Sequence, residues 1–105
     1  MNNKTKELQQ KFEILKSYYN SNQFELALEK AKLLMKEFPN VPVLHNFLGL
    51  VFVRLQKTKD AIEAYQTAIK LNPKMSIAYS NLGNIYHKVL KDTEMAKKSF
   101  EKARC

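Results

Sequence analysis

The chain has 105 residues, 45% of them hydrophobic and 27% charged, with a formal net charge of +8 at pH 7. This length allows one domain with a modest core and excludes an enzyme with a separate substrate domain. Only 2 glycines and 3 prolines leave too few turn residues for a protein of many short strands, so the composition favours an all-α fold. No apolar stretch reaches the roughly 18 residues that span a bilayer, and the first residues lack the apolar segment of a signal peptide. We therefore expect a cytoplasmic protein that does not contact a membrane.

The first expected helix begins near residue 8, because apolar residues at 8, 12, 15 and 19 have the spacing of one helical face. Asn22 and Glu25 have the spacing of a capping box, which predicts the start of a second helix. Asn40 followed by Pro42 predicts the start of a third.

Residues 44–55 read LHNFLGLVFVRL, an almost uniformly apolar segment whose composition would suit a buried strand. Leu48, Phe52 and Leu55, however, have helical spacing, and we assign them to a face that meets a paired helix. Thr58, Ser76 and either Asp92 or Thr93 are the candidate caps of three further helices, and Asn72-Pro73 ends the fourth.

A period of 34 residues relates these segments. Pro39 and Pro73 lie 34 residues apart, and Leu48-Gly49 returns as Leu82-Gly83. One period contains His45, Leu48, Gly49 and Phe52, followed by Ala61, Tyr65, Ala68 and Pro73.

At these spacings the sequence resembles the tetratricopeptide repeat, a helix-turn-helix unit. The resemblance implies an all-α fold, a right-handed superhelix of three antiparallel helix-turn-helix units with about six helices. We place the repeats at about residues 8–41, 42–75 and 76–105 of a single domain, 1–105. The third unit has one residue inserted between Leu90 and Thr93. In the first unit Leu15 takes the place of the glycine and Ala31 that of the aromatic residue.

Both glycines fall inside expected helices, where glycine costs about 1 kcal/mol relative to alanine. We predict that the missing side chain lets the paired helix approach closely. Gly49 would then face the fourth helix near Ala61 and Tyr65, and Gly83 the sixth helix near Ala96 and Phe100.

In tetratricopeptide arrays the ligand usually lies in a concave groove lined by the first helix of each unit. The corresponding positions here are Phe12, Lys16, Tyr19, Val43, Asn46, Leu50, Val53, Arg54, Ile77, Asn81, Asn84, His87 and Lys88. This set is aromatic in the first unit, apolar in the middle and polar to basic in the third. We expect an extended or helical peptide with an apolar centre and an acidic end. The alternative is that Leu50 and Val53 only pack against neighbouring units.

The resemblance implies a non-catalytic scaffold for protein binding. Family members that clamp the carboxylate of chaperone tails use Lys, Asn and Arg at five positions that hold Phe12, Lys16, Phe47, Ile77 and Asn81 here, so we expect no chaperone-tail binding. Asn81-Leu82-Gly83 instead resembles the repeats of O-linked N-acetylglucosamine transferases, whose asparagine at this place binds peptide backbone. Capping or solvent exposure explains Asn81 about as well.

No sequence motif indicates catalysis, since there is no phosphate loop, nucleophile elbow or suitably placed carboxylate pair. His45 and His87 have no acidic or thiol residue at ligand spacing, so we predict no metal and no cofactor. We expect His45 to be a packing residue between paired helices and His87 to offer hydrogen bonds in the groove.

Two other functions stay open. The chain could be the N-terminal targeting segment of a larger transferase, or a basic solenoid that binds nucleic acid. Against nucleic acid, the lysines are spread over every expected helix rather than gathered in a groove.

The ends of the array are candidate surfaces for self-association. Ile62 and Ile69 would meet the following repeat, whereas Lys97 and Arg104 at the equivalent positions suit an exposed cap. Cys105 has no partner within the chain, and it is either a spectator thiol or the site of an intermolecular disulfide.

Overall fold

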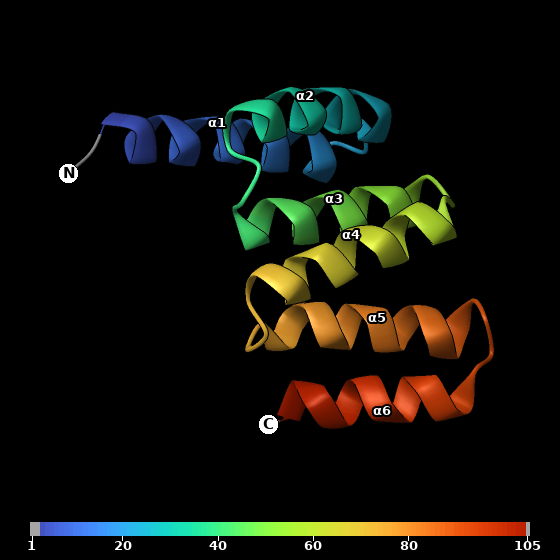
Figure 1. The fold of residues 1–105 in the computed structure, drawn as a ribbon. Helices are drawn as coiled ribbons and strands as arrows, with labels where there is room; N and C mark the ends of the chain where they lie inside the picture. The colour runs from blue at the N-terminus through green and yellow to red at the C-terminus, as the bar shows by residue number, and fades with distance from the viewer. Residues whose placement is uncertain (1–2, 105) are drawn as a thin grey trace.

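The computed structural model describes residues 3–104, which form six α-helices joined by short turns (Figure 1). The helices are α1 (Asn3–Asn20), α2 (Phe24–Glu37), α3 (Pro42–Arg54), α4 (Thr58–Leu71), α5 (Ser76–Lys88) and α6 (Thr93–Arg104). Consecutive helices form three antiparallel pairs, stacked into a slab of 43 × 29 × 19 Å. No strand occurs in the described residues, and the prediction of an all-α solenoid is confirmed. Cys105 lies outside the described residues.

The turn inside each pair is closed by one residue in the left-handed backbone conformation. These residues are Asn22 (φ 62°), Gln56 (φ 61°) and Lys91 (φ 56°). In the first two turns the following residue donates its backbone N–H to a carbonyl five residues earlier, at 2.9 Å in both, which is the Schellman arrangement. The third turn holds the predicted extra residue, and there the N–H of Asp92 bonds the carbonyl of Tyr86 at 2.7 Å.

The predicted side-chain caps have mixed outcomes. The prediction for Asp92 is confirmed, because its Oδ1 accepts the N–H of Met95 at 3.1 Å. The cap predicted at Asn22 is wrong, since this residue takes the left-handed conformation before α2 begins. Thr58 and Ser76 lie inside α4 and α5 as their first residues, and no side chain caps either helix.

Prolines mark two boundaries as predicted. Pro42 occupies the first turn of α3, although Val41 rather than Asn40 is the cap residue. Asn72 follows the last residue of α4, and its Oδ1 accepts the N–H of Lys74 at 3.1 Å, which fixes the turn toward α5.

The two glycines lie against aromatic rings of the paired helices, as predicted. A Cβ atom built on Gly49 would lie 2.4 Å from Cε1 of Tyr65, and one on Gly83 would lie 2.6 Å from Cε1 of Phe100. Neither ring can retreat cheaply, because both lie between packed helices. Glycine therefore sets the spacing of the second and third pairs.

The first pair reverses the sizes of these two residues. Leu15 stands where Gly49 stands in the second pair, Ala31 stands where Tyr65 stands, and both are buried (2% and 1% exposed). A large side chain on α1 thus faces a small one on α2. The helices α1 and α2 nevertheless pack less tightly against each other than α3 and α4 do.

Replacing Gly49 by alanine should destabilise the protein by about 1–3 kcal/mol, because the added methyl group overlaps the ring of Tyr65. Helix propensity alone would predict a gain of about 1 kcal/mol. The double variant Gly49→Leu, Tyr65→Ala copies the arrangement of the first pair, and it should be more stable than Gly49→Leu alone. Urea unfolding monitored by circular dichroism measures these differences, and a stabilised Gly49→Ala protein would contradict the packing account.

Burial raises the pKa of the Tyr65 hydroxyl above its ordinary value, and the nearby Tyr19 charge adds to this effect. In the unfolded chain the same hydroxyl ionises near pH 10. The contribution of Tyr65 to stability is therefore complete below about pH 10 and falls as the pH rises above it, because only the unfolded state loses the proton. Between about pH 9 and about pH 11, the free energy of unfolding should fall less in Tyr65→Phe than in the wild type. Urea unfolding at the two pH values measures this fall, and an equal fall in the two proteins would refute the prediction.

Candidate functional site

The predicted groove residues all lie on the first helix of a pair, on α1, α3 or α5. Those on α1, together with Val43, Asn46 and Leu50 of α3, line a cavity of about 310 Å³, whereas Val53 and Arg54 do not line it. Its lining consists of Phe12, Lys16, Tyr19, Asn20, Val43, Asn46, Phe47 and Leu50. The residues predicted on α5 do not line this cavity, and Ile77, Asn84, His87 and Lys88 are exposed along their own helix.

Phe47 lines the cavity although sequence reasoning did not place it among the groove residues. It is 4% exposed and lies one helical turn from both Val43 and Leu50. That i, i+4, i+7 spacing of 43, 47 and 50 was the signal that could have found it.

Aromatic rings form the wall of the cavity at its α1 end. The ring of Phe47 meets that of Phe12 edge-on, at 5.5 Å between centroids, and that of Tyr19 at 5.8 Å. Tyr19 also contacts Phe24 of α2 edge-on at 5.3 Å. Such edge contacts are attractive beyond the burial of their area, so this end of the cavity is preformed.

Two cations lie against this aromatic cluster. The guanidinium Cζ of Arg54 is 5.8 Å from the Tyr19 centroid and 5.4 Å from the Phe24 centroid, and its Nε donates to the Tyr19 hydroxyl at 3.3 Å. The Nζ of Lys16 is 5.2 Å from the Phe12 centroid and 2.8 Å from Oε1 of Glu13. Arginine held by ring faces keeps a fixed orientation, which suits recognition of a carboxylate.

Two valines of α3 are partly exposed. Val43 and Val53 are 40% and 39% exposed, so packing against neighbouring helices covers only part of their surface. Leu50 is half-buried in the cavity wall, and packing accounts for part of its surface.

Asn46 and Asn81 link adjacent helix pairs. The Nδ2 of Asn81 donates to Oδ1 of Asn46 at 3.0 Å, and Asn46 is only 5% exposed. No fully buried polar side-chain atom in residues 3–104 lacks a hydrogen-bond partner. The bond fixes α5 beside α3 next to the cavity.

The remaining predicted residues have simple surroundings. His45 is half-buried, and its Nε2 lies 2.8 Å from the carbonyl oxygen of Pro39, an arrangement in which a protonated Nε2 donates.

Among the described residues, no group of three His, Cys, Asp or Glu side chains is placed to hold a metal ion. None of the described helices has the length and apolarity needed to cross a membrane.

Replacing Asn81 by alanine should cost about 1–3 kcal/mol, because it leaves the buried carbonyl of Asn46 without its partner. The double variant Asn46→Ala, Asn81→Ala should lose less than the sum of the two single variants. Urea unfolding of the four proteins measures the coupling, and strictly additive losses would show that the bond contributes nothing.

Comparison with known proteins gives matches along most of the chain. Residues 49–89 match the family described as TPR repeat, and residues 77–103 match the family described as tetratricopeptide repeat. Tetratricopeptide repeat protein 6 from Homo sapiens is 47% identical over 47 residues, which cover 45% of this chain and 8% of that protein. The uncharacterized protein ycf37 from Pyropia yezoensis is 27% identical over 88 residues, covering 75% of this chain and 49% of that protein. The chain thus spans less than half the length of both relatives.

Solved structures share the fold over nearly the whole chain. The first TPR of Spaghetti (RPAP3), bound to the HSP90 peptide SRMEEVD, superposes with a TM-score of 0.84 at 26% identity, covering 91% of this chain and 75% of that one. Its second TPR, bound to the same peptide, gives 0.83 at 18% identity, with coverages of 92% and 89%. The crystal structure of MamA gives 0.85 at 22% identity, with coverages of 92% and 56%.

Proposed function

Since the chain belongs to the tetratricopeptide repeat family, we propose that it is a non-catalytic protein-interaction module that holds a peptide or a partner helix in the groove formed by α1, α3 and α5. The observation that carries this proposal is the aromatic-walled cavity between α1 and α3, with exposed valines beside it. Exposed apolar side chains next to a preformed cavity are typical of a binding surface.

The ligand is a segment with an apolar residue that enters this cavity and an acidic residue beside it. Phe12, Phe47 and Leu50 offer apolar surface, and no acidic side chain lines the cavity. Arg54 stands at the aromatic cluster as a fixed cation, and Lys88 supplies a second positive charge on α5. An acidic segment also suits the net charge of +8, which accelerates encounter with negatively charged partners.

The HSP90 peptide bound by the two RPAP3 domains is a useful contrast. In this chain two positions of the carboxylate clamp hold Phe12 and Phe47, whose rings contact each other at 5.5 Å. A terminal carboxylate placed between these rings would lose water, and the one charged donor beside them, Lys16, is already paired with Glu13 at 2.8 Å. We therefore propose recognition of an internal apolar and acidic segment, not of an acidic chain terminus.

Binding is measurable by fluorescence, because the chain contains no tryptophan and a tryptophan in the peptide reports alone. The probes are an extended peptide that alternates leucine with glutamate, the same peptide with lysine for glutamate, and SRMEEVD, each carrying one tryptophan. We expect the leucine–glutamate peptide to bind at least about tenfold more tightly than the other two. The variant Val43→Lys, Val53→Lys should weaken its binding at least about tenfold.

The matched control is Met95→Lys on α6, which exchanges a side chain of similar exposure (38%) away from the groove. It should bind the leucine–glutamate peptide like the wild type, and circular dichroism checks that all variants are folded. Failure of that peptide to bind, equal binding by the groove variant, or tighter binding of SRMEEVD would overturn the proposal.

A further inference from the structure

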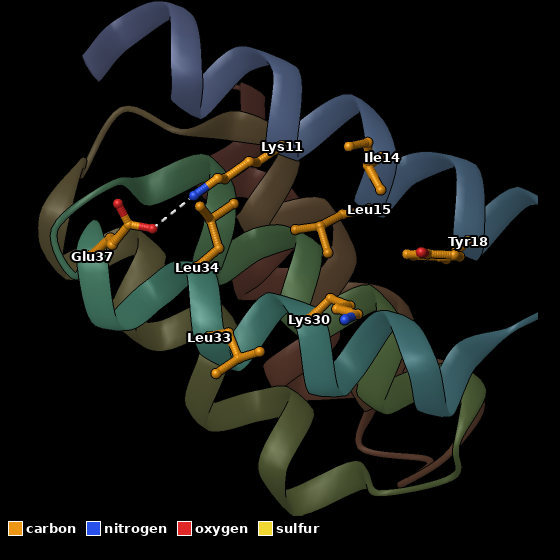
Figure 2. A pocket seen from close by; sticks show the side chains of 8 residues that line it. All are labelled: Lys11, Ile14, Leu15, Tyr18, Lys30, Leu33, Leu34 and Glu37. Atoms are coloured by element: carbon orange, nitrogen blue, oxygen red, sulfur yellow. Dashed lines mark hydrogen bonds and ion pairs between the residues drawn. The ribbon is translucent and has the colours of Figure 1, made fainter. Parts of the chain in front are cut away.

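A second cavity opens at the end of the array, between α1 and α2 (Figure 2). Its volume is about 350 Å³, and its lining consists of Lys11, Ile14, Leu15, Tyr18, Lys30, Leu33, Leu34 and Glu37. Ile14 and Leu33 are 53% and 52% exposed, among the most exposed large apolar side chains described. Ile14 and Tyr18 of this cavity lie on a different face of α1 from the groove residues Phe12, Lys16 and Tyr19.

The second helix pair indicates what such a face normally contacts. Leu48 and Phe52 occupy the positions of Ile14 and Tyr18 one repeat later, and Met35 from the preceding α2 lies with them around one cavity. A helix carrying an apolar side chain therefore covers this face in the second pair. In the first pair the equivalent face is open.

One face of α2 at this end carries a lysine and a glutamate, spaced so that two antiparallel copies of the helix can pair them with each other. Lys30, Leu33, Leu34 and Glu37 are spaced i, i+3, i+4 and i+7, so they share one helical face, and all four line the cavity. If two such helices run antiparallel with a two-fold axis between Leu33 and Leu34, Lys30 of each helix comes opposite Glu37 of the other. The exposed Leu33 of each helix lies near the centre of the same contact, above the buried Leu34 (4% exposed).

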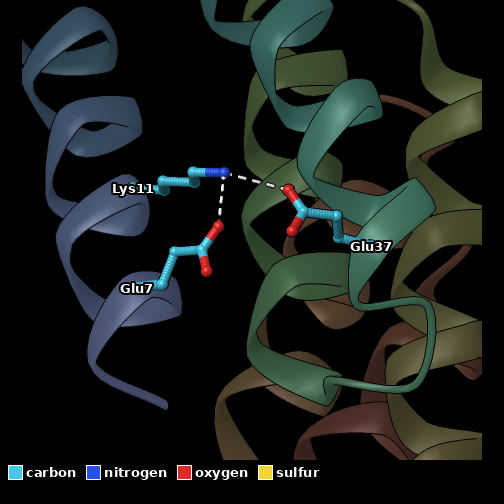
Figure 3. Close-up of polar contacts among 3 residues, drawn as sticks. All are labelled: Glu7, Lys11 and Glu37. Atoms are coloured by element: carbon cyan, nitrogen blue, oxygen red, sulfur yellow. Dashed lines mark hydrogen bonds and ion pairs between the residues drawn. The ribbon is translucent and has the colours of Figure 1, made fainter. Parts of the chain in front are cut away.

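The ion pairs within one chain are compatible with this pairing between two copies. Glu37 Oε1 lies 2.9 Å from the Nζ of Lys11, which also binds Oε1 of Glu7 at 2.8 Å (Figure 3). Lys11 thus already has a second carboxylate, and Lys30 makes no ion pair among residues 3–104. Lys30 of another copy would give this acidic cluster its second cation.

We propose that two copies of the chain associate through this end, with α2 antiparallel to α2 of the other copy. Leu33 of each copy enters the cavity between α1 and α2 of the other, and Ile14 becomes buried. The two Lys30–Glu37 pairs set the register, while the apolar contacts supply most of the stabilisation. The groove stays open in both copies, so the proposal stands independently of the proposed function.

Sedimentation equilibrium tests the association over protein concentrations from about 1 µM to about 1 mM, the range in which weak complexes form. The wild type should shift from monomer to dimer mass as the concentration rises. Leu33→Glu should weaken dimerisation at least about tenfold, because it places a charge in the other copy's cavity. Leu90→Glu, a change of similar exposure (48%) in the turn before α6, should dimerise like the wild type.

Charge exchange tests the register. In Lys30→Glu two carboxylates face each other across the dimer, and in Glu37→Lys two ammonium groups do, so each variant alone should dimerise less than the wild type. An equimolar mixture of the two should regain the dimer mass, because both contacts between the different chains are then of opposite sign. A wild type that stays monomeric, a dimer insensitive to Leu33→Glu, or a mixture that gains nothing would overturn the proposal.

Discussion

The contact between a glycine and an aromatic ring determines how the helices of the second and third pairs lie. Tyr65 and Phe100 occupy the space that side chains at Gly49 and Gly83 would fill, so the backbones of each pair come close together. The energetic cost of glycine in a helix is offset by burial of a large ring between the two backbones. The close pairing holds α3 and α5 in place, and all the residues proposed for ligand binding except Phe12, Lys16 and Tyr19 of α1 lie on these two helices.

Sequence reasoning reached the features that depend on spacing along one chain segment. The six helices, the approach of Gly49 to Tyr65, the extra residue before Thr93 and the cap at Asp92 all follow from local pattern and period. Ser76 does not cap α5, because Met75 is the cap residue. The caps expected at Asn22 and Thr58 failed for a different reason. Backbone hydrogen bonds around a left-handed residue close the turns before α2 and α4, and a side-chain cap is not needed there.

The site was harder to predict, because its important contacts cross between helix pairs. The Asn46–Asn81 bond joins residues 35 positions apart, and the stacking of Arg54 on Phe24 joins α3 to α2. Both depend on how neighbouring pairs are rotated against each other, which no periodicity specifies. The cavity at the end of the array is similar: the departures at Leu15 and Ala31 were visible in the sequence, whereas the looser crossing of α1 and α2 was not.

The extra residue in the turn before α6 also bears on how such an array can change during evolution. With a strict period of 34 residues, Ser99 would stand where Tyr65 stands, and the ring opposite Gly83 would be missing. The turn instead absorbs the added length, so Phe100 reaches the glycine and Ser99 takes a buried neighbouring position. An insertion is therefore neutral for packing when it falls between two helices, and the same insertion within α6 would separate every residue behind it from its contact.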